Sequence, residues 1–153
     1  MILWRLSSAR HARAFDGGYG LLHNGRWNTA GHPVTYCATS PSLCVLEKLV
    51  HIEDPLLMPA QVMLRYEVPD SVETETVTIL ELPVSWRRQE GWTQRRGDQW
   101  CHENRTPLLV VPSVIIPLAE SPDRNVMINH RRSASARIRL ASAEEFKFDP
   151  RLL

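Results

Sequence analysis

The most apolar run of the chain, residues 108–117, constrains its fold more than any other segment. It reads Leu-Leu-Val-Val-Pro-Ser-Val-Ile-Ile-Pro, so nearly every side chain in it favours burial. Proline has no backbone N–H to donate to a sheet, and Pro112 and Pro117 therefore divide the run into a short buried strand and a bent continuation. We expect a strand of the protein core, with Ser113 at its kink.

Shorter segments rich in apolar residues predict further strands. They are residues 2–6, 34–38, 61–68 and 76–82, with one more near 136–140. In the second of these segments the alternation of side chains puts Val34, Tyr36 and Ala38 on one face.

Two segments carry the signals of helices. The first covers residues 41–52, where Ser40 can cap the N-terminus and Pro41 suits the first helical position. The second covers residues 93–103, although Gly97 in its middle disfavours a helix. Strands interspersed with a few short helices predict an α+β fold.

The composition of the chain argues against several classes of protein function. The chain has 153 residues, 43% of them hydrophobic, which suits one globular domain over residues 1–153. The formal net charge of +1 gives no broad basic field, which disfavours direct nucleic-acid binding. The apolar start is too short for a signal peptide, and no run approaches the ~18 apolar residues of a membrane span, so we expect a cytoplasmic protein without membrane contact.

Three cysteines, Cys37, Cys44 and Cys101, show no metal-ligand spacing, and their odd number argues against a disulfide framework. We expect reduced thiols without a special chemical role. The sequence also lacks a G-x-x-x-x-G-K-[ST] loop and a G-x-G-x-x-G turn, which excludes the ordinary P-loop and dinucleotide-binding folds. No ligand cluster is present, so we expect no metal.

Glu47 is the most informative single residue, because it borders the apolar face of the helix predicted at 41–52. At about 100° per residue, Glu47 and His51 lie one turn apart on the edge of that face. The face comprises Leu43, Leu46, Leu49 and Val50. A carboxylate there would be partly desolvated and would need a partner. The alternatives are a Glu47 that reaches solvent or pairs with a neighbour, and a His51 that interacts with the helix dipole.

A turn-rich segment, residues 15–33, must be held in place by other parts of the protein. Arg26 in this segment can present its guanidinium to a phosphate or a carboxylate, the alternative being a surface arginine. Trp27 and Tyr36 could form a flat wall for an aromatic ring, although such residues more often belong to the core. Ser113 lies in no G-x-S-x-G turn and is not a hydrolase nucleophile, but its hydroxyl needs a partner if buried.

The order of several short motifs resembles the RES family over nearly the whole chain. These motifs are Gly25-Arg26-Trp27-Asn28, Gly31-x-Pro33-Val34-x-Tyr36-x-Ala38-x-Ser40, Leu46-Glu47 with His51, Val111-Pro112-Ser113 and Asp149-Pro150-Arg151-Leu152. The Arg, Glu and Ser that give the family its name match Arg26, Glu47 and Ser113. One stretch departs from the pattern: the family usually carries Asn-Pro-x-His-Pro near the end, and here only Asn129 of residues 129–133 matches.

The resemblance implies a small α+β domain with a mixed central sheet, similar to the ADP-ribosyltransferases. Such proteins are typically toxins of bacterial toxin–antitoxin modules and pair with an Xre-type antitoxin. They consume NAD⁺ as a substrate, without a further cofactor, and pass ADP-ribose to water, phosphate or a side chain of a target protein.

The resemblance also implies roles for individual residues. Because nicotinamide leaves behind a positively charged ribose, Glu47 would stabilise that charge. Arg26 would hold the pyrophosphate or the nearby ribose, and Ser113 would fix the substrate by a hydrogen bond. The remaining substrate contacts would be Tyr36 against the nicotinamide ring, together with Trp27, His51 and Asn129. The alternative function is a non-catalytic module that holds a nucleotide or a partner protein in the same pocket.

Overall fold

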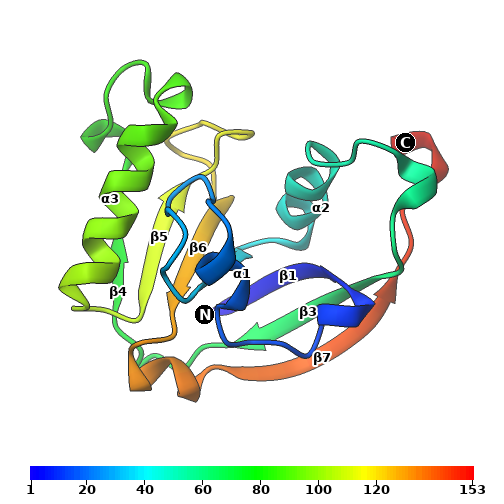
Figure 1. Ribbon diagram of the computed structural model, residues 1–153, viewed down its shortest axis with the longest axis horizontal. Helices are drawn as coiled ribbons and strands as arrows, with labels where there is room; N and C mark the ends of the chain where they lie inside the picture. The colour runs from blue at the N-terminus through cyan, green and yellow to red at the C-terminus, as the bar shows by residue number, and fades with distance from the viewer.

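One mixed sheet of seven strands organises the computed structural model, which describes residues 1–153 (Figure 1). The strands are β1 (Ile2–Ser8), β2 (Val34–Ala38), β3 (Gln61–Glu67), β4 (Thr74–Thr76), β5 (Leu108–Pro112), β6 (Arg124–Asn129) and β7 (Arg139–Phe146). Their order across the sheet is β4-β5-β6-β2-β1-β3-β7. Only β4 and β5 run parallel, and all other neighbours are antiparallel.

Three α-helices accompany the sheet: α1 (Gly18–Leu22), α2 (Pro41–Leu49) and α3 (Glu90–Glu103). Figure 1 shows α3 alongside β4 and β5 at one end of the sheet, whereas α2 lies on the side of β1. Short 3-10 helices occupy the connections, at Ala9–His11, Pro55–Leu57, Ile79–Glu81, Trp86–Arg88, Ser133–Arg137 and Pro150–Leu152. No helix is long and apolar enough to cross a membrane.

The side chains of β5 and β6 alternate between two core clusters, one on each face of the sheet. Val126 and Ile128 pack with residues of β1 and β3, whereas Met127 between them packs with Trp100 of α3. Because elements cover both faces here, four of the five residues of β5 are buried. The core strand predicted from the apolar run is thus confirmed, with Ser113 immediately after its end.

Most other predicted elements are confirmed, with small shifts of their ends. The strand at 34–38 matches residue for residue, and those at 2–6 and 61–68 match within two residues. The first helix begins at Pro41 as expected and ends three residues early, and the second begins three residues early, at Glu90.

Two predicted strands are wrong. Of residues 76–82 only Thr76 lies in a strand, because Glu81 accepts hydrogen bonds from the backbone N–H and the hydroxyl of Thr78 (2.6 and 2.8 Å) and closes a 3-10 turn. Most of residues 136–140 also lie outside strands, since a 3-10 helix runs to Arg137 and β7 begins at Arg139. β7 is an exposed edge strand that pairs with β3 alone, so no apolar alternation marks it in the sequence.

Candidate functional site

The Glu47 carboxylate receives two hydrogen bonds from distant parts of the chain. Ser113 donates its hydroxyl to Glu47 Oε1 (3.0 Å), and the Asn125 side-chain amide donates to the same oxygen (2.6 Å). Ser113 is fully buried, and its oxygen also accepts from the backbone N–H groups of Ile115 (3.0 Å) and Ile116 (3.3 Å). No protein group donates to Oε2, so one oxygen fixes the carboxylate and the other is available.

Contacts at the start of α2 set the position of Glu47 relative to β6. Ser40 caps the helix by accepting from Leu43 N (3.2 Å), as predicted, and donates its hydroxyl to Asp123 (2.5 Å). Thr39 exchanges further hydrogen bonds with the backbone at residues 122–124. The segment that begins α2 is therefore tied to the segment that begins β6, where Asn125 lies.

The buried face of α2 is narrower than predicted. Leu43 and Cys44 are buried against β1 and β2, but Leu46 and Val50 are 37% and 60% exposed. The helix packs through its first turns and turns its last apolar residues toward solvent. Glu47 is half-buried, on the side that meets Ser113 and Asn125.

Arg26 is anchored to the 3-10 helix at Trp86–Arg88. Its Nη2 donates to the Trp86 carbonyl (2.6 Å), and its guanidinium carbon lies 5.7 Å from the centre of the Trp86 ring. Burial lowers the pKa of Arg26, Glu90 raises it and Arg87 lowers it, yet an arginine stays charged at neutral pH. Arg26 is thus a fixed cation on an aromatic surface.

One face of α3 holds the turn-rich segment that carries Arg26. The Thr93 hydroxyl donates to the Arg26 carbonyl (2.7 Å), and the Gln94 side chain donates to the Gly25 carbonyl (3.0 Å). Asp98 accepts from the backbone N–H and the hydroxyl of Thr29 (2.8 and 2.7 Å). These contacts are the support that the sequence required for residues 15–33.

Gly97 allows the closest approach between α3 and this segment. A Cβ atom at Gly97 would lie 1.7 Å from the Trp27 carbonyl oxygen, so only glycine fits. The residue that seemed unfavourable for a helix is therefore required by the packing of the helix.

Tyr36 lies on β2 with its hydroxyl inside the turn-rich segment. The hydroxyl donates to Asn28 Oδ1 (2.7 Å) and accepts from the Trp27 backbone N–H (3.0 Å). Burial raises the pKa of Tyr36, so its hydroxyl stays protonated. The ring is half-buried at the margin of the core cluster that contains Trp86, so it forms part of the surface near Arg26.

Three further predicted site residues form no hydrogen bond with the Glu47 carboxylate. The Trp27 ring is 1% exposed and packs in the core. Asn129 is fully buried, donates to Asn104 Oδ1 (3.1 Å) and accepts from the Arg131 backbone (3.0 Å), which shapes a turn. His51 lies beyond the end of α2, is exposed and forms no hydrogen bond with Glu47.

Asn125 is the site residue that the sequence did not identify. Its register partner in β2 is Ala38, so it shares a sheet face with Tyr36 and Met127. An asparagine directly before the apolar residues 126–128 was the available signal, since a polar residue on the inner face of a core strand needs a partner.

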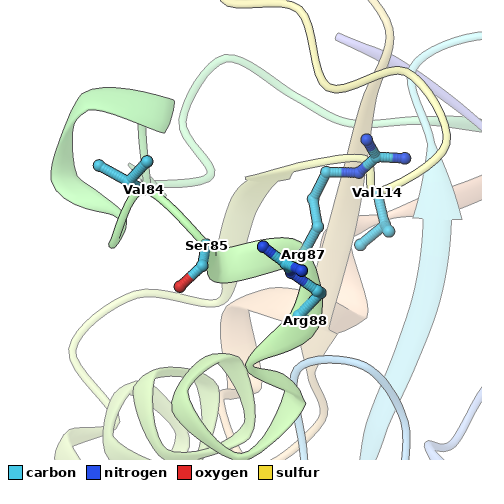
Figure 2. A pocket seen from close by; sticks show the side chains of 5 residues that line it. All are labelled: Val84, Ser85, Arg87, Arg88 and Val114. Atoms are coloured by element: carbon cyan, nitrogen blue, oxygen red, sulfur yellow. The ribbon is translucent and has the colours of Figure 1, made fainter.

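A surface hollow with a volume of about 490 Å³ is formed by the 3-10 helix at Trp86–Arg88, the segment before it and the segment after β5 (Figure 2). Its lining residues are Val84, Ser85, Arg87, Arg88 and Val114. It contains none of the predicted site residues, but Val114 directly follows Ser113 and Arg87 directly follows Trp86. No three His, Cys, Asp or Glu side chains gather as metal ligands.

The structure thus holds a carboxylate, Glu47, that is fixed through one oxygen, and a cation, Arg26, that is anchored to Trp86. A carboxylate of this kind can stabilise a developing positive charge, and arginines can hold phosphates. Such a site suits a substrate that carries a phosphate and develops positive charge where a bond breaks.

Comparisons with known proteins show the family of the chain. The family model described as RES domain matches residues 2–149. A "Toxin Res" of Pseudomonas putida (strain KT2440) is 38% identical over 156 residues, covering 99% of each chain. A "Prs ADP-ribosylating toxin" of Sphingobium sp. (strain YBL2) is 33% identical over 157 residues, covering 98% of this chain and 95% of its own.

The fold is similar to a chain in the crystal structure of the M. tuberculosis MbcT–MbcA toxin–antitoxin complex. The TM-score is 0.66, and the match covers 95% of this chain and 83% of that chain. At 16% identity the likeness concerns the fold alone, and it agrees with the predicted α+β class.

Proposed function

Because the chain belongs to the RES domain family, we propose that it is the toxin of a toxin–antitoxin pair and that it breaks the nicotinamide–ribose bond of NAD⁺. The relatives named above are toxins, one of them ADP-ribosylating. The observation that carries the proposal is the Glu47 carboxylate, which Ser113 and Asn125 fix through Oε1 while Oε2 is available.

The chemistry follows from the charge that develops on the ribose. When the bond between ribose C1′ and the ring nitrogen breaks, its electron pair goes to the nitrogen and nicotinamide leaves as a neutral molecule. The positive charge is then shared by C1′ and the ribose ring oxygen, and a nearby carboxylate stabilises it. An acceptor oxygen or nitrogen bonds to C1′ and loses its proton.

Each residue of the candidate site has a role in this proposal. Glu47 acts on the ribose through Oε2, and Arg26 holds a phosphate of the substrate. Ser113 is fully buried, so we assign it the positioning of Glu47 in place of a direct substrate contact. Tyr36 forms part of the surface that receives the nicotinamide ring. Trp27 supports Arg26 from within the core.

The protein partners follow from the same proposal. An Xre-type antitoxin would neutralise the toxin, and we expect it to insert a cationic or polar tail near Arg26 and Glu47. A target protein is one of three acceptors for ADP-ribose, beside water and phosphate. The mass of the product distinguishes the three: ADP-ribose, ADP-ribose-1″-phosphate or a modified protein.

The test is the release of nicotinamide from NAD⁺, measured by mass spectrometry, for the wild type and for Glu47→Gln. Glutamine keeps the shape but removes the charge, so we expect release to slow about 100-fold or more. The matched control is Glu53→Gln, which removes an exposed carboxylate four residues after Leu49, the end of α2. We expect it to behave as the wild type.

Two results would contradict the proposal. Nicotinamide release by Glu47→Gln at the wild-type rate would exclude the role of this carboxylate. Unchanged NAD⁺ with the wild type, in buffer, in phosphate and in cell extract, would instead favour the non-catalytic binding module.

A further inference from the structure

The hollow shown in Figure 2 combines two cations with two apolar side chains. Arg87 and Arg88 come from the 3-10 helix at Trp86–Arg88, Val84 from the segment before it, and Val114 from the segment after β5. Its volume of about 490 Å³ lies within the range of small-molecule sites. Val84 is fully exposed, and so is free to contact a ligand.

The positive charge at this place is not balanced by ion pairs. None of Arg26, Arg87 and Arg88 forms a salt bridge, whereas Arg96 of α3 pairs with Glu75. Arg87 is close enough to Arg26 to lower its pKa, and Glu90 is the carboxylate that acts on Arg26 in the opposite direction. Like charges held together without a partner favour an anionic ligand.

The hollow adjoins the candidate site along the chain at two points. Trp86, whose carbonyl accepts from Arg26, directly precedes Arg87. Val114, which directly follows Ser113, packs against the same core cluster as Tyr36. The residues that line the hollow are therefore the chain neighbours of Ser113 and of the residue that anchors Arg26.

We propose that the hollow binds the ADP half of NAD⁺, with Arg87 and Arg88 on the pyrophosphate and Val84 and Val114 against the adenosine. This inference rests on the proposed function and names the part of the protein that recognises the substrate. Free phosphate is a poorer fit, because it would use the arginines but not the two valines. An arginine pair suits a pyrophosphate, since each guanidinium can donate two parallel hydrogen bonds.

The test is the binding of ADP, a probe that needs no bond cleavage, followed by the quenching of tryptophan fluorescence or by calorimetry. We expect R87A/R88A to bind ADP at least about tenfold more weakly than the wild type, because charge-assisted hydrogen bonds are lost. R87K/R88K keeps the charges and should recover part of the affinity.

A charge-matched control is R13A/R137A, which removes two exposed arginines outside the hollow and should bind ADP as the wild type does. In steady-state assays of nicotinamide release, R87A/R88A should raise KM for NAD⁺ and leave kcat nearly unchanged. A merely structural change would lower kcat as well.

Two outcomes would overturn the inference. The first is ADP affinity in R87A/R88A equal to that of the wild type. The second is a loss of affinity for inorganic phosphate in R87A/R88A while ADP affinity is kept, which would make the hollow a site for the acceptor. If the wild type bound ADP through these arginines but left NAD⁺ intact, the proposed reaction would fail and the nucleotide site would stand.

Discussion

Glu47 occupies a position that α2 alone would not favour. It lies in the last turn of the helix, where unpaired carbonyl groups make the end partly negative and a carboxylate is destabilising. The hydrogen bonds from Ser113 and Asn125 offset this, because both donors stabilise the charged form. Glu47 is thus unfavourable for the stability of the helix, and two hydrogen-bond donors fix its orientation. This combination indicates a functional role for Glu47.

Asn125→Asp tests whether Asn125 positions Glu47. The new carboxylate would lie where the amide now donates at 2.6 Å from Glu47 Oε1. Two like charges at that distance raise the pKa of one carboxyl group, so we expect lower kcat at neutral pH and an activity profile that shifts toward higher pH. The measurement is nicotinamide release between pH 5 and pH 9.

Asn125→Ala separates the lost hydrogen bond from the added charge. Hydrogen bonds to charged groups contribute about 1.5–3 kcal/mol, so kcat should fall roughly tenfold or more, without the shift toward higher pH. Thermal unfolding of both variants identifies any loss of folding. If the pH profile of Asn125→Asp matched that of the wild type, Asn125 would not position Glu47.

Helix α3 supports the turn-rich segment, residues 15–33, which carries Arg26. Thr93, Gln94 and Asp98 face that segment and satisfy its backbone groups, and Gly97 between them lets the two backbones touch. Thr93 and Gly97 are four residues apart, as are Gln94 and Asp98, so each pair lies one above the other on the helix. The position of Arg26 is therefore a property of α3 as much as of the segment itself.

Gly97→Ala should displace this segment. The added methyl group would lie 1.7 Å from the Trp27 carbonyl oxygen, so the helix and the segment must separate. We expect the free energy of unfolding to fall by about 1–3 kcal/mol and the activity to fall as well. Urea unfolding and nicotinamide release measure the two effects.

Gly91→Ala on the same helix is the matched control. A Cβ atom there meets only the tip of Arg95, at 3.5 Å, so stability should stay the same or rise slightly. Equal stability of the two alanine variants would show that the contact at Gly97 is not tight in solution.

Elements with strong local signals could be predicted from the sequence. The start of α2 was marked by its cap and its proline, and β2 by its alternation. The partner of the turn-rich segment could not be predicted, because the contacts of Arg26 and Thr29 with α3 span 67 and 69 residues. The strand predicted near 136–140 overlaps only the start of β7 (Arg139–Phe146), because an exposed edge strand has no buried face to impose a pattern.

At the scale of the molecule, the site depends on the order of the strands. The sheet places β6 between β5 and β2, which brings the end of β5 and the start of β6 to α2. Ser113 and Asn125 are 66 and 78 residues from Glu47, distances that no local pattern can bridge. The ordered motifs, matched to a family, suggested Arg26, Glu47 and Ser113 as site residues and an α+β fold. The structure shows the fold and joins Ser113 to Glu47 by a hydrogen bond.

Unfolding of the whole molecule should depend on the protonation of His130. This side chain is half-buried after β6, where Nε2 hydrogen-bonds the Thr35 hydroxyl (2.9 Å) and Phe15 packs edge-on against the ring. Burial lowers the pKa of His130, Asp16 raises it and Arg5 lowers it. The folded state therefore binds fewer protons than the unfolded state, in which the pKa is about 6.5.

The sign of the effect follows from this difference. Stability rises with pH wherever the unfolded state binds more protons, so the contribution of neutral His130 is present above pH ~6.5 and is lost as the pH falls from there through the lower folded-state pKa. His130→Gln keeps a hydrogen-bonding group but cannot be protonated, so the variant should lose less stability than the wild type between pH 8 and pH 5. Urea unfolding at several pH values measures this, with the exposed His11→Gln as control. If the free energies of unfolding of His130→Gln and the wild type changed with pH in parallel, proton uptake at His130 would not destabilise the folded state. Other groups would then account for any loss of stability in acid.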